Sequence, residues 1–312
     1  MIQIDLITGF LGSGKTTFLI QYAKRFMNEG AKVGIIENDF GAVNVDMLLL
    51  QDLVGDYCEL EMISGGCDIA CHRRRFKTKL ISMGMRGFSR IIVEPSGIFD
   101  VDEFFDLLHE EPLDRWYEIG NVITIVDACL EADMSKQADY LLASQLARAG
   151  QVIFSRSQNA TLAQMSDTIA HVNNAMEMIQ CKRRFTMDDM ITKPWDEWGS
   201  EEYARVRDSG YVREDFVKFW FHQNEVFQSV YFLNMQDSIE HVKKGIQQVF
   251  TDSECGNVFR IKGFLATSQQ NWLEINATRQ GISLQERSKG QDVLIVIGEK
   301  LNEDRIRQYF VS

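Results

Sequence analysis

Short runs of isoleucine and valine alternate with amphipathic stretches through the first half of the chain, which predicts strands and helices in turn. Strands so rich in these residues suit a parallel sheet that is buried on both faces. The stretches between them carry apolar residues at helical intervals. The expected strands are Ile2–Thr8, Lys32–Ile36, Arg90–Val93, Asn121–Val126 and Gln151–Phe154. The expected helices are Lys15–Asn28, Asp68–Met83, Val101–His109, Leu130–Ala149 and Thr161–Ile179.

The pattern changes in the last third of the chain, beginning near Glu225. Two segments with helical spacing, Ser238–Phe250 and Glu303–Phe310, stand among four short apolar runs that suit an antiparallel sheet. Between the two halves, Asp188–Trp220 is charged and aromatic without periodicity, which predicts an irregular connector. The strands expected in the last third are Val226–Phe232, Val258–Phe264, Trp272–Ala277 and Val293–Ile297.

The composition limits the class of protein. A length of 312 residues suggests about two domains of roughly 150 residues each. The 33 Lys and Arg residues against 45 Asp and Glu residues leave a formal charge of −12, which argues against a general nucleic-acid binder. No apolar run approaches the ~18 residues of a membrane span, and the chain starts on a predicted strand without a basic leader. We therefore expect a cytoplasmic protein with reduced thiols and with no membrane or nucleic-acid partner.

The segment Gly9-Phe-Leu-Gly-Ser-Gly-Lys-Thr16 matches the phosphate-binding loop and lies between a predicted strand and a predicted helix, as that loop requires. Its glycines let the backbone curl around phosphate groups, so that successive N–H groups and the helix start point at the anion. Lys15 is expected to neutralise β- and γ-phosphate oxygens, and Thr16 to bind Mg²⁺ through its hydroxyl. The residues expected to hold the nucleotide at this loop are Gly9, Gly12, Ser13, Gly14, Lys15, Thr16 and Thr17.

The loop also sets the predicted fold class. We expect an α/β protein with the parallel, helix-flanked sheet of the P-loop NTPases, followed by a small α+β C-terminal domain. The expected boundaries are 1–186 for the nucleotide-binding domain, 187–224 for the connector and 225–312 for the C-terminal domain. In such sheets, ligands bind at the carboxyl ends of the strands.

Two acidic residues are expected at that edge of the sheet. Glu94 ends the apolar segment Ile-Ile-Val-Glu, and Asp39 lies in Asn-Asp-Phe-Gly after another predicted strand. We expect both to bind Mg²⁺ together with Thr16. The catalytic set would be Lys15, Asp39 and Glu94, in which one of the two carboxylates acts on the attacking water. A solvated strand-end carboxylate would give the same sequence at Glu94, and a plain N-cap or turn residue would give it at Asp39.

Taken together, these motifs resemble those of the CobW-type P-loop GTPases, a branch whose members include maturation factors of urease and nickel hydrogenase. The resemblance implies Mg²⁺-dependent GTP binding with slow hydrolysis. Many members of the family are metallochaperones for zinc, cobalt or iron that serve a client metalloprotein, and the resemblance implies this role as well. The matching segments are Gly9–Thr17, Asn38–Gly41 with Asp46, Glu94–Gly97, Val126–Asp127, Gln145-Leu-Ala-Arg-Ala and Arg260-Ile-Lys-Gly-Phe264.

The guanine-recognition loop departs from the family pattern Asn-Lys-x-Asp. The matching positions here are Ser155, Arg156, Ser157 and Gln158. An Asp carboxylate accepts two hydrogen bonds from guanine, whereas Gln158 offers one carbonyl oxygen and a donor amide. This exchange is expected to weaken base selectivity by on the order of 1–3 kcal/mol. Arg156 is still expected to lie along the base, so we expect GTP as the nucleotide, with ATP left open.

The metal motif departs as well, because the family's Gly-Cys-x-Cys-Cys is replaced by a segment with Cys67, Cys71 and His72. If a helix begins near Cys67, the two thiols lie on one face about 5–6 Å apart at Cβ. Two thiolates so placed suit Zn²⁺ or another soft transition metal, with His72 as a possible third ligand. Two small core residues at helical spacing would give the same pattern.

Several alternatives remain open in the sequence. The protein could be a cargo-free, NTP-dependent activator of a corrinoid or other metalloenzyme, or a P-loop kinase of a small molecule. The basic run His72–Lys79 is expected to be a solvated helix face, and Trp195 and Trp198 are expected to fix the connector onto a domain. Cys58 could be brought near the metal segment by folding. The oligomeric state, a homodimer included, is also open.

Overall fold

The structure is a computed structural model that describes residues 1–39, 45–64, 69–221, 226–235, 237–267 and 271–310. The chain divides into two compact units. The first unit contains Met1–Ala42 and Leu49–Phe219, and the second contains Val43–Leu48 and Trp220–Ser312. None of the helices in the described ranges combines the length and the hydrophobicity that a bilayer crossing demands.

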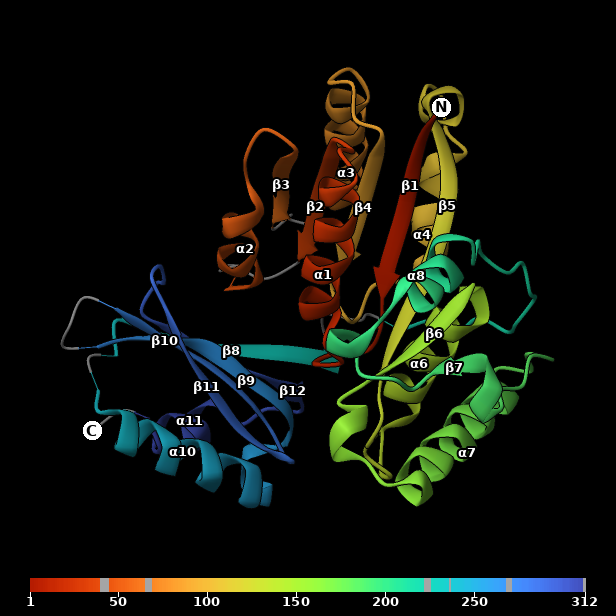
Figure 1. Cartoon of the computed structure of the whole chain (residues 1–312). Helices are drawn as coiled ribbons and strands as arrows, with labels where there is room; N and C mark the ends of the chain where they lie inside the picture. Colours follow the sequence, from red (N-terminus) through yellow and green to blue (C-terminus); the bar gives the residue numbers. More distant parts are fainter. Residues whose placement is uncertain (40–44, 65–68, 222–225, 236, 268–270, 311–312) are drawn as a thin grey trace. The chain divides into compact units, whose positions relative to one another are not determined.

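A parallel sheet, seven strands wide over the described residues, forms the centre of the first unit (Figure 1). Its order is β3-β2-β4-β1-β5-β6-β7, and the described neighbours pair in parallel. The five strands expected in this half are confirmed, although β2, β4, β5 and β6 extend beyond the expected ends. The strands are β1 (Ile2–Thr8), β2 (Val33–Asp39), β3 (Cys58–Ser64), β4 (Arg90–Pro95), β5 (Tyr117–Asp127), β6 (Gln151–Ser155) and β7 (Met190–Ile191).

Helices cover both faces of this sheet. Consecutive strand residues point to opposite sides, and in these strands the residues on both sides are apolar and need to be buried. Ile7 of β1 belongs to a buried cluster with Phe18 of α1 on one face. Leu6, its neighbour, belongs to a second cluster with Phe76 of α3 and Phe104 of α4 on the other face. The helices of this unit are α1 (Lys15–Asn28), α3 (Ile69–Gly84), α4 (Val101–Leu108), α5 (Leu113–Trp116), α6 (Lys136–Arg148), α7 (Leu162–Met178) and α8 (Ser200–Arg207).

The helix expected from Leu130 to Ala149 is shorter than predicted, since α6 begins at Lys136. Ser135 occupies the N-cap position, and its Oγ accepts the N–H of Ala138 at 3.1 Å. Such a cap contributes about 1 kcal/mol to helix stability. The apolar spacing before Ser135 therefore misled the prediction of the helix start.

The expectation of an irregular connector over Asp188–Trp220 is wrong in part. The segment supplies β7, which pairs in parallel with β6 at the edge of the sheet, and the helix α8. β7 is only two residues long, which is too short to show a periodicity. In α8 only Val206 is buried, so the helix lacks the apolar stripe by which helices are recognised.

Two further strands, β3 and β11, were not predicted, and both lie at the edge of a sheet. In β3, Glu59 and Glu61 interrupt the apolar pattern and form ion pairs with basic side chains. In β11 (Gly281–Arg287), Ile282 and Leu284 are the apolar residues of an otherwise polar strand. Charged and polar residues are common on edge strands, where they oppose pairing with other molecules.

The second unit is built on an antiparallel sheet in the order β11-β10-β9-β12-β8. Val242 and Ile246 of α10 and Ile306 of α11 pack in one buried cluster with residues of this sheet. The four strands and two helices expected here are confirmed, with α11 shorter than predicted. The other elements are β8 (Phe227–Leu233), β9 (Asn257–Ala266), β10 (Trp272–Thr278), β12 (Val293–Glu299), α10 (Ile239–Thr251) and α11 (Glu303–Arg307).

A short segment between β2 and β3 completes the second unit. Asp46, in the helix α2 (Val45–Leu50), pairs with Lys262 of β9 at 2.5 Å between Oδ2 and Nζ. Both residues are buried. Removing one partner of such a pair leaves a buried charge without its counterion, which typically costs about 3–5 kcal/mol. Asp46 and Lys262, which belong to two family-matching segments far apart in the sequence, thus pair inside one unit.

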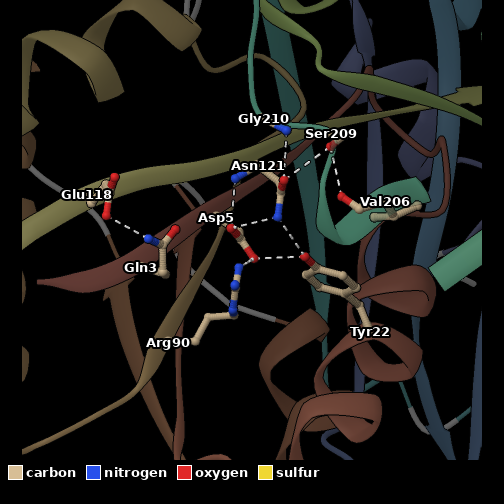
Figure 2. Close-up of polar contacts among 9 residues, drawn as sticks. All are labelled: Gln3, Asp5, Tyr22, Arg90, Glu118, Asn121, Val206, Ser209 and Gly210. Carbon is tan, nitrogen blue, oxygen red and sulfur yellow. Dashed lines mark hydrogen bonds and ion pairs between the residues drawn. The ribbon is translucent and has the colours of Figure 1, made fainter. Parts of the chain in front are cut away.

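A buried carboxylate lies in the middle of β1 (Figure 2). The register of β1 and β5 shifts at this point, so that Gly120 and Asn121 stand opposite Asp5 as a bulge. Asp5 accepts the backbone N–H of Asn121 at 2.8 Å and the hydroxyl of Tyr22 at 2.9 Å, and it pairs with Arg90. A Cβ on Gly120 would lie 2.3 Å from Oδ1 of Asp5, so glycine is required there.

This polar network joins four elements of the first unit. Asn121 of β5 also donates to Tyr22 of α1 at 3.2 Å and accepts the N–H of Gly210, after α8, at 2.9 Å (Figure 2). Burial raises the pKa of the Tyr22 hydroxyl well above its usual value, and the negative charge of Asp5 adds to the rise. Tyr22 therefore stays a neutral donor, and α1 is fixed over the sheet through it.

The start of α4 carries an unusual carboxyl group. Asp100 caps this helix by accepting the N–H of Asp102 at 2.9 Å. One turn on, burial raises the pKa of Glu103 to about 7, the charge of Asp100 adds to the rise, and Arg73 opposes it. Glu103 thus changes its charge near neutral pH, unlike an exposed glutamate.

Candidate nucleotide site

The glycine-rich loop has the backbone conformation that its sequence predicts. Gly9, Gly12 and Gly14 have φ values of 146°, 76° and 99°, in the region that favours glycine. A Cβ on Gly9 would lie 2.3 Å from the carbonyl oxygen of Ile125. Gly14 is the N-cap of α1, so the loop leads from β1 directly into a helix start, where backbone N–H groups favour anions.

Lys15 and Thr16 are the first two residues of α1, and both are buried. Nζ of Lys15 donates to the carbonyl oxygens of Gly9 at 3.1 Å and Phe10 at 3.3 Å, which holds the ammonium group over the loop. Oγ1 of Thr16 donates to Oε1 of Glu94 at 2.7 Å. The structure therefore brings together Lys15, Thr16 and Glu94 at the carboxyl edge of the sheet.

A further carboxylate, which the sequence analysis missed, is placed by the register of the sheet. Glu37 of β2 stands opposite Glu94 of β4, and both are 3% exposed. Neighbours in register point to the same face of a sheet. Asn38 follows, fully buried, and its side chain has no hydrogen-bond partner among the described residues. Asp39 ends β2, and its side chain is outside the described part of the structure.

The segment after β4 packs against the backbone of the phosphate-binding loop. A Cβ on Gly97 would lie 2.6 Å from the backbone nitrogen of Leu11, so the two backbones can pack this closely only with glycine. Gln145 of α6 donates from Nε2 to the carbonyl oxygen of Gly97 at 3.0 Å. Gln145, which begins one of the family-matching segments, thus holds the backbone of Gly97, which ends another.

The loop after β6 reaches the phosphate-binding loop through Arg156. This residue has a left-handed backbone, with φ 54°, and its Nη2 donates to the carbonyl oxygen of Gly12 at 2.9 Å. Its other Nη pairs with Asp127 at the end of β5. Ser155 is buried, whereas Gln158 is exposed in a 3₁₀ turn. Three loops at one edge are therefore tied together by a single guanidinium group.

Trp195 and Trp198 follow β7 and pack on α1, as expected for residues that fix the connector. Their ring centroids lie 6.0 and 5.6 Å from that of Phe18. Trp195 is also next to the phosphate-binding loop, because a Cβ on Gly14 would lie 3.4 Å from its Cη2. Only the pairing of β7 with β6 brings this residue to the site, and no sequence motif indicated it.

The proposed metal segment is described in part. Cys67 lies outside the described residues, α3 is described from Ile69, Cys71 is half-buried, and His72 is 2% exposed. Among the described residues there is no group of three or more His, Cys, Asp and Glu side chains that could hold a metal. Cys58 is the buried first residue of β3, but Cys67 lies outside the described residues, so the idea that Cys58 joins that segment stays a prediction.

The basic run on α3 is solvated in part: its Arg and Lys side chains are exposed or half-buried, as expected, but His72 and Phe76 are buried. Arg73 and Lys77 both pair with Glu110 at 2.6 Å, and Lys79 pairs with Glu61 at 2.5 Å. Partly exposed pairs of this kind contribute about 0–1 kcal/mol each. Two carboxylates therefore offset part of the positive charge of these three side chains.

A parallel sheet whose first strand leads through this loop into a helix, with Thr16 and Glu94 in contact beside it, defines a P-loop nucleotide-binding domain. The family model "CobW/HypB/UreG, nucleotide-binding domain" matches residues 3–186, and the "Cobalamin synthesis protein cobW C-terminal domain" matches residues 237–312. The chain belongs to the CobW/HypB/UreG family of nucleotide-binding proteins, which confirms the resemblance drawn from its motifs.

Several known proteins are similar to the chain. Zinc chaperone YjiA of Escherichia coli (strain K12) is 30% identical over 186 residues, which cover 55% of each chain. Zinc chaperone YeiR of the same organism is 31% identical over 163 residues, 52% of this chain and 48% of YeiR. The matches therefore span about half the length of these relatives. The crystal structure of Zn(II)-bound YjiA GTPase aligns over 99% of this chain and 98% of that one, at 23% identity and a TM-score of 0.40.

Proposed function

We propose that the protein is a GTP-hydrolysing metallochaperone of the cytoplasm, which uses the nucleotide state to control the transfer of zinc or another transition metal to a client metalloprotein. The contact of Thr16 with Glu94 beside Lys15 carries this proposal, because a hydroxyl, a carboxylate and an ammonium group are what a magnesium–nucleotide site would require. The names of the relatives support it, since two are called zinc chaperones and a third, from Schizosaccharomyces pombe, "Zinc-regulated GTPase metalloprotein activator 1".

The donor set at this position fits Mg²⁺. The Thr16 hydroxyl and the Glu94 carboxylate lie within hydrogen-bond distance of one another and are buried, and both offer hard oxygen ligands. Asp39 would add a third oxygen from the end of β2. Bound Mg²⁺ supplies positive charge to the β- and γ-phosphate oxygens. Thr16, Glu94 and Asp39 are thus the proposed ligands.

The residues of the chain would do the rest of the hydrolysis by positioning and charge. Lys15 would turn from the Gly9 carbonyl to the β- and γ-phosphate oxygens, while the loop N–H groups bind the remaining phosphate oxygens. Asp39 or Glu94 would orient the attacking water. Because nothing else in the proposed mechanism activates that water, we propose slow turnover.

GTP is the proposed nucleotide, held at its base by Ser155, Arg156 and Gln158. Arg156 is fixed by Gly12 and Asp127, so its stem is available as a rigid support beside the base. Gln158 offers both a donor and an acceptor, which suits guanine and adenine alike. We therefore propose weaker discrimination against ATP than an aspartate at position 158 would give.

The proposed cargo site is formed by Cys67, Cys71 and His72, with thiolates that favour a soft ion. The test is the metal content after anaerobic, tag-free purification, with and without Mg-GTP, in the wild type and in Cys67→Ser/Cys71→Ser. Cys181→Ala, which removes a buried thiol after α7, is the matched control. Stoichiometric metal that is lost in the double variant, kept in the control and changed by nucleotide would support the proposal.

A cargo-free activator is the second candidate, favoured by the separation of the two thiols in the sequence. In that case, metal would be absent in every nucleotide state while GTP still binds, and the client would be recognised by docking alone. Absence of GTP binding would overturn both candidates. The boundaries 1–186, 187–224 and 225–312 remain our proposed division along the sequence, although β7 and α8 pack with the first unit and Asp46 with the second.

A further inference from the structure

The strand order fixes the direction in which a nucleotide lies in the proposed site. The proposed magnesium ligands are on α1, β4 and β2, so the terminal phosphates lie toward the β4 and β2 side of β1. The strands β5, β6 and β7 are on the other side of β1. A nucleotide with its phosphates in the loop therefore extends its base over the carboxyl ends of β6 and β7.

Two loops emerge at that end. One follows β6 and contains the proposed base-binding residues from Ser155 to Gln158. The other, 192–195, follows β7, which pairs with β6 in parallel, with Val152 opposite Met190 and Ile153 opposite Ile191. Parallel neighbours end at the same edge, so the two loops lie beside each other. The second loop carries one large aromatic side chain, that of Trp195.

The indole of Trp195 is held next to the last glycine of the phosphate-binding loop. A Cβ on Gly14 would meet Cη2 of Trp195 at 3.4 Å and Cβ of Ser155 at 3.5 Å, so these side chains border the same spot. The ring packs on Phe18 at 6.0 Å and is half-buried. Ser155 is small, which leaves the tip of the indole beside the loop that begins the base-binding segment.

We propose, on the basis of the proposed function, that Trp195 is a wall of the nucleobase pocket and contacts the purine ring of the bound nucleotide. Contact between an aromatic ring and a base changes affinity by about 5- to 150-fold and tolerates every base, because each base has a π-face. Trp195 thus replaces by ring contact part of the affinity that a carboxylate at position 158 would supply. It adds affinity without selecting guanine over adenine.

Trp198 provides the comparison, because its half-buried ring is held by contacts with other parts of the protein and none of its described contacts is with the phosphate-binding loop. Its Nε1 donates to the carbonyl oxygen of Lys193 at 2.9 Å. Its ring packs edge-on against Phe18 at 5.6 Å and against Tyr203 at 5.4 Å. Trp198 thus has the fixing role that was expected of both tryptophans, and Trp198→Phe is the matched control.

The experiment measures the affinity of the full chain with Mg²⁺ for GDP, ADP and inorganic pyrophosphate. Pyrophosphate occupies the loop but has no base. In Trp195→Leu we expect GDP and ADP to bind at least ten-fold more weakly, which is about 1.4 kcal/mol, while pyrophosphate affinity is unchanged. Trp198→Phe should keep all three affinities. GDP should quench tryptophan fluorescence in the wild type and in Trp198→Phe, and this quenching should be lost in Trp195→Phe.

Two results would overturn the assignment. Unchanged GDP affinity in Trp195→Leu would mean that the ring does not contact the base. An equal fall for GDP and pyrophosphate would mean that Trp195 only supports the phosphate-binding loop. Failure of the proposed function is distinguishable from both, because the wild type itself would then bind neither GDP nor pyrophosphate.

Discussion

The buried network around Asp5 yields a quantitative prediction for the stability of the first unit. Oδ1 of Asp5 accepts from the backbone and the side chain of Asn121, and Oδ2 accepts from Tyr22 and Arg90. The described partners of this carboxylate are thus all donors. In Asp5→Asn, the new amide nitrogen would face two donors in either of its two orientations, although the side chain keeps its shape.

The magnitude follows from the bonds that this substitution removes. Each hydrogen bond to a charged group contributes about 1.5–3 kcal/mol, and Arg90 would lose its buried counterion. Breaking a buried ion pair from one side costs about 3–5 kcal/mol. Asp5→Asn is therefore expected to lower the free energy of unfolding by about 3–5 kcal/mol. The hydrogen bond by which Tyr22 ties α1 to β1 would be weakened at the same time.

Urea unfolding monitored by circular dichroism is the assay, and Glu118→Gln is the control. Glu118 belongs to the same region and accepts a hydrogen bond from Gln3 at 2.8 Å, but at an exposed position (Figure 2). Its replacement is expected to change stability by less than about 0.5 kcal/mol. Equal losses for Asp5→Asn and Glu118→Gln would refute the assignment of a buried, donor-only network.

Substitutions at three other places test separate features. Lys15→Ala should abolish tight binding of Mg-GDP in a calorimetric titration, and near-normal affinity would contradict the assignment of the phosphate-binding loop. Glu103→Gln should leave the free energy of unfolding near pH 4 unchanged and raise it at pH 8 by up to about 3 kcal/mol. In the wild type, the raised pKa of Glu103 stabilises the folded state below about pH 4.5, and this contribution is lost as the pH rises through about 7. An equal difference between the variant and the wild type in urea unfolding at the two pH values would disprove this reasoning. Lys262→Met should cost about 3–5 kcal/mol in thermal or urea unfolding, and a second change, Asp46→Asn, should recover part of that loss.

The elements that were predicted correctly are those whose own sequence shows a clear pattern of apolar or glycine residues. β1 and α1 have the predicted bounds, since an isoleucine-rich strand, a glycine loop and an amphipathic helix each leave a local pattern. The phosphate-binding loop was found for the same reason, because its conformation depends on glycines at fixed positions.

The parts that could not be predicted depend on pairing between distant segments. Glu37 reaches the site only through the register that sets it opposite Glu94, and Trp195 only through the pairing of β7 with β6. A strand of two residues has no periodicity, and a helix such as α8 with one buried residue has no apolar stripe. The sequence therefore predicted the local structure of the phosphate-binding loop better than the strand pairings that bring Glu37 and Trp195 beside it.

The pair of Asp46 and Lys262 has a consequence for synthesis on the ribosome. The two residues are 216 positions apart, and Asp46 lies among the first fifty residues to emerge. Domains generally fold as units in the order of their synthesis, but the second unit here requires a piece that was made before most of the first. Its completion is therefore postponed until β9 has left the exit tunnel. A fragment that starts at Trp220 would likewise carry Lys262 into the core without Asp46 to neutralise it, so the second unit is not transferable as a continuous stretch of gene.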